Sequence, residues 1–137
     1  MWRILSMVVV TTFVLFSSNV VSAADPVPLK TFMRAKLDHS KKLLEALTTE
    51  NYEVMAKESQ NLSLLTLAEQ WEVLQTPEYV QHSREFRRTA DAIREAAEKK
   101  NLDGASLAYV ELTMKCINCH KYIKRNRMAG NFDALQR

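Results

Sequence analysis

Apolar side chains recur at alternating spacings of four and three residues in four segments of the chain, a pattern typical of one face of an α-helix. The four mostly apolar stripes are Leu29, Met33, Leu37, Ser40, Leu44 and Leu47; Tyr52, Met55, Ser59, Leu62, Leu65 and, at its limit, Trp71; Tyr79, His82, Phe86, Ala90, Ile93 and Ala97; and Ala105, Tyr109, Leu112, Cys116, Cys119 and Ile123. No segment after the N-terminal apolar run alternates with a period of two. The pattern therefore predicts an all-α fold, an antiparallel up-down four-helix bundle.

Polar residues mark the ends of these expected helices. Asn51 is a suitable N-cap for the second helix, and Thr76 for the third, where Pro77 takes the first helical position. Residues 101–103 supply the last turn and its cap. We expect the helical domain to cover residues 24–125 and the tail, residues 126–137, to fray.

The N-terminal sequence has the pattern of an export signal. Met1, Trp2 and Arg3 precede an apolar run over residues 4–16, and the polar stretch that follows ends in Val21-Ser22-Ala23. This order predicts a secretory signal peptide over residues 1–23, cleaved before Ala24. The alternative is an uncleaved anchor, but the run is shorter than the roughly 18–20 residues that a membrane span needs. We therefore expect a periplasmic or otherwise exported protein without a stable membrane anchor.

Composition and charge narrow the class of protein. The 137 residues include only 2 Gly and 3 Pro, with 47% hydrophobic and 26% charged residues, which favours one globular domain. Of the charged residues, Arg3 is the only one among the first 24, so 18 basic and 16 acidic residues remain in the rest of the chain. That balance argues against nucleic-acid binding, which normally requires a concentrated basic excess.

The segment Cys116-Ile117-Asn118-Cys119-His120 is the most specific motif in the chain. On a helix, positions 116, 119 and 120 fall within an arc of about 100°, so both sulfurs and the imidazole project from one face. Cys-x-x-Cys-His is the attachment signature of c-type haem, in which two thiols bind the porphyrin vinyl groups and the histidine binds the iron. We therefore predict one covalent haem c held by Cys116 and Cys119, with His120 as the proximal iron ligand.

Three other interpretations of the cysteines compete with haem attachment. A structural zinc site normally needs four ligands, and only His39 and His82 could add to the local three. A thioredoxin-like redox pair requires a βα context, which this helical pattern does not provide. A plain disulfide is the usual state of a cysteine pair in an oxidising compartment, but it would leave His120 on the core stripe without a role.

A four-helix chain with an export signal and this motif near its end, over about residues 29–125, resembles the class II c-type cytochromes, the cytochrome c-prime family and its low-spin relatives. The resemblance implies a haem between the helices near one end of the bundle. It also implies that a residue early in the first helix faces the open side of the iron, as Met in low-spin members. The matching position is Met33. An up-down bundle would independently bring Met33 and His120 to the same end.

Another residue could be the distal iron ligand in place of Met33, and Met33 itself has a simpler interpretation. A Met at helical spacing is usually an adaptable core residue. His82 also lies on a stripe and could bind the iron, bond a haem propionate or rest as a half-buried core histidine. His39 lies off the first stripe, which predicts exposure to solvent. We expect Met33 to be the distal ligand.

Two functions suit such a haem. A filled iron suits single-electron transfer between redox partners, whereas an open sixth position suits binding or sensing of a diatomic gas such as NO or CO. We expect the first, and not an enzyme, because no arrangement of nucleophile and base stands out. Five basic residues cluster around the motif: Lys115, Lys121, Lys124, Arg125 and Arg127. Some could bind the propionates, some could favour the C-terminus of a helix and the rest could steer an acidic redox partner, although each one on its own fits an ordinary solvated face better. Homodimer formation stays open.

Overall fold

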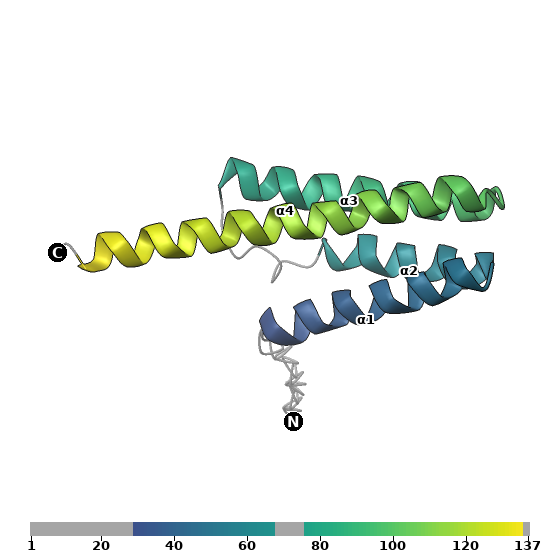
Figure 1. Cartoon of the computed structure of the whole chain (residues 1–137), viewed down its shortest axis with the longest axis horizontal. Helices are drawn as coiled ribbons and strands as arrows, with labels where there is room; N and C mark the ends of the chain where they lie inside the picture. The colour runs from purple at the N-terminus through teal and green to yellow at the C-terminus, as the bar shows by residue number, and fades with distance from the viewer. Residues whose placement is uncertain (1–28, 68–75, 136–137) are drawn as a thin grey trace, which may run out of the picture.

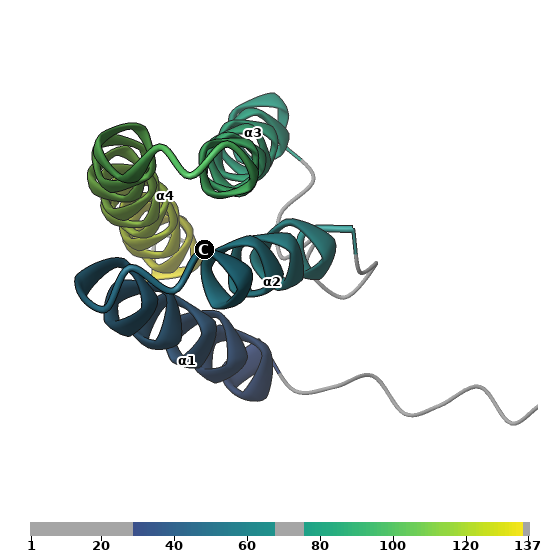
Figure 2. The same ribbon diagram turned by 90° about the vertical axis from the view of Figure 1, so that its right-hand side faces the viewer.

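The structure, a computed structural model, describes residues 29–67 and 76–135. Within them the chain forms four helices and no strands: α1 (Leu29–Thr48), α2 (Tyr52–Leu65), α3 (Pro77–Glu98) and α4 (Leu102–Leu135). α1 packs on α2, α2 on α3 and α3 on α4, while the seam between α1 and α4 is much looser (Figures 1 and 2). The predicted all-α class is confirmed.

The predicted helix caps form. The Asn51 side chain accepts a hydrogen bond from the Val54 backbone N–H, and Thr76 accepts one from Tyr79. Asn101 likewise accepts from the Gly104 N–H over 2.9 Å. Each cap satisfies a backbone donor that the first helical turn cannot satisfy itself, so these residues define where α2, α3 and α4 begin.

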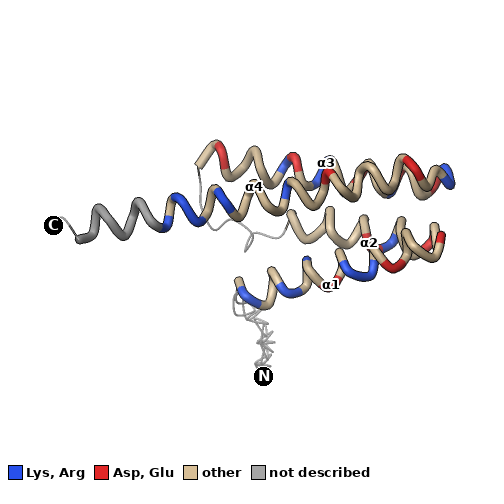
Figure 3. Tube along the Cα trace, viewed as in Figure 1, with Lys and Arg blue, Asp and Glu red and all other residues tan. Residues whose placement is uncertain are grey.

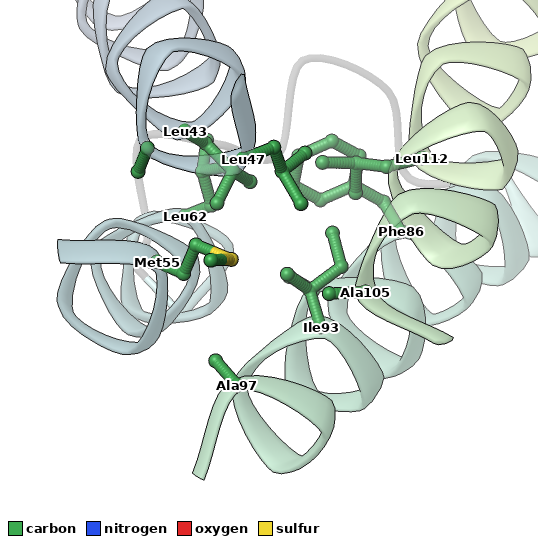
Figure 4. Packing of buried hydrophobic residues seen from close by; sticks show 11 residues of the cluster. Leu43, Leu47, Met55, Leu62, Phe86, Ile93, Ala97, Ala105 and Leu112 are labelled. Carbon is green, nitrogen blue, oxygen red and sulfur yellow. The ribbon is translucent and has the colours of Figure 1, made fainter. Parts of the chain in front are cut away.

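The core fills the space between all four helices (Figure 4). Its fully buried side chains include Leu43 of α1, Met55 and Leu62 of α2, Ile93 of α3 and Leu112 of α4. Full burial of a side chain of this size stabilises a fold by about 1.5–3 kcal/mol, so the core is where the four helices are held together. The predicted stripe residues of α2, α3 and α4 that lie in the core include Met55, Ser59, Leu62, Tyr79, Phe86, Ala90, Ile93, Ala97, Ala105 and Leu112.

On α1 the predicted stripe is largely wrong. Leu37 and Leu44 are 46% and 48% exposed, and the buried residues of α1 are Phe32, Leu43, Ala46 and Leu47. Two neighbouring stripes on this helix carry apolar residues at helical spacing, and the packing against α2 and α3 selects the one that contains Phe32 and Leu43. The other stripe, with Met33, Leu37 and Ser40, faces the looser side towards α4.

α4 is longer than the sequence pattern indicates. It continues as a helix to Leu135, past residue 125, the predicted end of the helical domain. Residues 126–135 contain no proline and one glycine, so nothing in that stretch breaks a helix. The fraying of residues 126–137 stays a prediction. The proposed signal peptide and Trp71 lie outside the described residues, and no described helix is long and apolar enough to cross a membrane.

Candidate haem site

A groove of about 520 Å³ runs along the seam between α1 and α4, with Phe86 of α3 at its floor. Its volume falls within the roughly 300–1,000 Å³ of ligand pockets in proteins. All four residues predicted from sequence to hold the haem line it: Met33 from α1, and Cys116, Cys119 and His120 from α4. The fold therefore brings together residues that are more than 80 positions apart in the sequence.

The groove exists because the two helices diverge. The Tyr109 hydroxyl donates a hydrogen bond to the Ser40 carbonyl oxygen over 3.2 Å, which ties α4 to α1 partway along the seam. Burial raises the pKa of Tyr109, so this donor stays protonated at neutral pH. From there towards the start of α1 the helices separate (Figure 1). Met33 and the Cys116–His120 segment lie in that wider part.

Both cysteines are half-buried thiols in the wall of the groove, and neither is in a disulfide. Burial raises the pKa of each thiol because the thiolate loses hydration, and the nearby Lys36 ammonium acts in the opposite direction. At neutral pH both thiols are therefore protonated, and both are accessible from the groove. His120 is exposed and also lines the groove, while Met33 is half-buried on the opposite wall.

Lys36 is one of the groove residues that the sequence pattern did not reveal. Its ammonium lies 3.5 Å from the centre of the Phe86 ring, an arrangement that a cation favours over an aromatic face. Burial lowers its pKa to about 7, although both cysteines act to raise it. The available signal was its position one turn after Met33, on the same side of α1.

The other two histidines lie elsewhere. His39 is not the exposed residue that we expected, because its Nδ1 lies 2.6 Å from the carboxylate of buried Glu58 on α2. His82 stacks at an angle on Tyr122, with ring centroids 5.4 Å apart, and does not line the groove. Over residues 29–67 and 76–135, no group of three or more His, Cys, Asp or Glu side chains is arranged to hold a metal ion. Neither His39 nor His82 lines the groove in which Cys116, Cys119 and His120 lie.

Basic residues reach the groove from both walls. Of the cluster predicted around the motif, Lys115 lines the groove and lies 3.4 Å from the carboxylates of Glu85 and Glu111. Lys30 and Arg34 of α1 line it too, and the sequence pattern did not single them out. Figure 3 shows the basic residues of early α1 and of the second half of α4 at the same end of the molecule.

Comparison with known proteins finds no family model, curated protein or solved structure that matches this chain.

Proposed function

We propose that this protein is an exported c-type cytochrome of the class II kind, with one covalent haem c that serves single-electron transfer between redox partners. The proposed fold is an antiparallel up-down four-helix bundle with the haem near one end. One observation carries the proposal: Cys116, Cys119, His120 and Met33 line a single groove. The motif by itself requires only Cys116, Cys119 and His120 to lie close together. Met33 lies in the same groove because α1 packs beside α4 in the fold.

The groove suits a large, mostly apolar group with charged edges. Leu37 and Ile117 are 46% and 41% exposed, and both side chains line the groove, where an apolar ligand would cover them. Lys30 and Arg34 line the same groove and could pair with carboxylates of a ligand, whereas Lys115 already pairs with Glu85 and Glu111. A haem has both features, an apolar macrocycle and two propionates, so the residues present fit this group.

Each residue then has a defined task. Cys116 and Cys119 would hold the haem through thioether bonds, His120 would be the proximal iron ligand and Met33 the distal one. The haem supplies a one-electron couple between ferric and ferrous iron. The chain would supply a nitrogen from His120 and a sulfur from Met33 to hold the iron, and apolar walls to exclude water. Its basic end would suit an acidic face on the redox partner.

Substitution of the proposed distal ligand tests the function. Met33→Ala should convert a low-spin absorption spectrum into a high-spin one and let carbon monoxide bind faster, because it removes the sixth ligand. Leu64→Ala, which truncates an exposed apolar side chain of α2, is the control and should leave both the spectrum and the binding rate unchanged.

Two outcomes would contradict electron transfer through a His120/Met33 iron. Wild-type protein that is already five-coordinate and binds NO or CO readily would favour the gas-binding alternative. A spectrum that is unchanged by Met33→Ala but altered by His82→Ala would identify His82 as the sixth ligand.

A further inference from the structure

α4 carries a second apolar stripe, on the side that faces away from the bundle. Leu107, Val110, Met114 and Ile117 are 73%, 62%, 48% and 41% exposed. At about 100° per residue, all four point within about 40° of the direction opposite the buried Leu112. We call these four side chains the outer face of α4.

Such a face is unusual for a helix at the surface of a bundle. Surface helices normally have one apolar stripe towards the core and polar residues opposite. α4 has apolar residues on both sides, with Ala105 and Leu112 in the core and the outer face exposed. A contiguous exposed apolar stripe of this kind marks an interaction surface.

The charges at the two ends of the outer face indicate what covers it. Asp103 precedes Leu107 by four residues and Lys121 follows Ile117 by four, and both are exposed. By helical angle, both lie in the middle of the same stripe. The order acid, Leu, Val, Met, Ile, base is symmetric in spacing about position 112 and opposite in charge at its ends.

We propose that the outer face of α4 binds the same face of a second copy of this chain, with the two helices antiparallel about a two-fold axis beside position 112. In this register Leu107 meets Ile117 of the partner subunit, and Val110 meets Met114 of the partner subunit. Asp103 meets Lys121 of the partner subunit at each end. A two-fold interface needs a surface that complements itself, and this spacing and charge pattern provide one.

The contact spans residues 103–121, a helical length of about 27 Å. Ile117 also lines the groove, but Leu107, Val110 and Met114 do not. The contact therefore rests mainly on residues outside the groove, and a failure of the dimer or of the proposed electron transfer leaves the other proposal testable.

Sedimentation velocity of the purified full chain tests the apolar part of the contact. We expect a dimer at tens of micromolar protein. Val110→Glu should weaken it at least about tenfold, because the carboxylate would be buried against the Met of the partner subunit without a counter-charge. Leu64→Glu, at an exposed apolar position on α2, is the matched control and should leave the dimer intact. Circular dichroism checks that both variants stay folded.

Charge reversal tests the register. Asp103→Lys alone places two lysines opposite each other at both ends of the contact, and Lys121→Asp alone places two aspartates there, so each variant should dissociate more readily than wild type. An equimolar mixture of the two should form heterodimers, because each lysine then meets an aspartate. The double variant should also regain self-association.

Three results would overturn the proposal. They are a wild-type monomer throughout the concentration range, a dimer that Val110→Glu does not weaken, and charge variants that fail to complement each other when mixed. A wild-type monomer would indicate that the outer face binds a different protein. The third would exclude the antiparallel register about position 112.

Discussion

Lys36 is the residue whose protonation depends most on the groove. Its ammonium has lost much of its hydration, which lowers its pKa from 10.5 in an exposed lysine to about 7. Above pH 7 the folded haem-free protein therefore releases this proton while the unfolded chain still holds it. Because the unfolded state then binds more protons, the free energy of unfolding rises with pH.

We expect the free energy of unfolding to rise between pH 7 and about 9, by no more than about 1.4 kcal/mol per pH unit. Lys36→Met should remove this dependence on pH. It should also stabilise the haem-free protein at pH 7, since the variant keeps an apolar side chain and removes the buried charge. Urea unfolding at pH 6, 7, 8 and 9 measures both effects. Above pH 9 the cysteine thiols act in the opposite sense, because burial raises their pKa above the usual 9.0.

Equal slopes in wild type and Lys36→Met would show that Lys36 does not lose its hydration in the fold. Lys36→Arg serves as the comparison. A guanidinium cannot be deprotonated, so this variant should be the least stable of the three at pH 9 and should gain nothing as the pH rises.

At the scale of the helix, α1 offers a matched pair of leucines for the groove. Leu37 and Leu44 are seven residues apart and almost equally exposed, but only Leu37 lines the groove. A haem in the groove would cover Leu37 and leave Leu44 in water. Leu37→Ser should therefore reduce the stabilisation of the protein by haem by about 1 kcal/mol, roughly half the value of burying a whole leucine.

Urea unfolding of the haem-loaded and haem-free forms gives this stabilisation for each variant. Leu44→Ser should leave it unchanged, although it alters the same residue type on the same helix. Equal losses in Leu37→Ser and Leu44→Ser would show that the groove wall on α1 does not contact the haem.

The helices that sequence reasoning predicted best are those with strong end signals. Asn51, Thr76 and Asn101 each cap a helix through their own side chain, a local interaction that residue type and position reveal. The position of α1 along the chain is predicted correctly, but its buried face is not. Two adjacent apolar stripes on this helix have the same spacing, and only contacts with α2 and α3 decide which one is buried. Local pattern cannot supply that information.

The residues of the candidate site likewise fall into those that a local motif predicts and those that depend on tertiary contacts. Cys116, Cys119 and His120 follow from a short motif on one helix, so their shared face could be predicted. The contact of Lys36 with Phe86 and the approach of Lys30 and Arg34 depend on how α1 lies against α3 and α4. The outer face of α4 could not be predicted either, since the spacing of apolar residues does not tell which of two stripes on one helix faces the core.

At the scale of the whole molecule, the groove lies where the bundle is least closely packed. Three of the four seams between the helices are well packed, and the α1–α4 seam opens towards the end that carries the cysteines and Met33. The tight seams hold the fold together, which leaves the loose one free to accept a large group. The basic residues of early α1 and of the second half of α4 lie at that same end (Figure 3).

The most direct test of the account is the mass and colour of the denatured protein, made together with haem-attachment machinery. The account predicts that unfolded wild-type protein keeps its haem absorption and is heavier than the bare chain by one haem. Cys116→Ala combined with Cys119→Ala should lose both the colour and the added mass. His120→Ala should keep the added mass but change the spectrum of the folded protein, because it removes an iron ligand and leaves the thiols. Colourless wild-type protein with a disulfide between Cys116 and Cys119 would contradict the account.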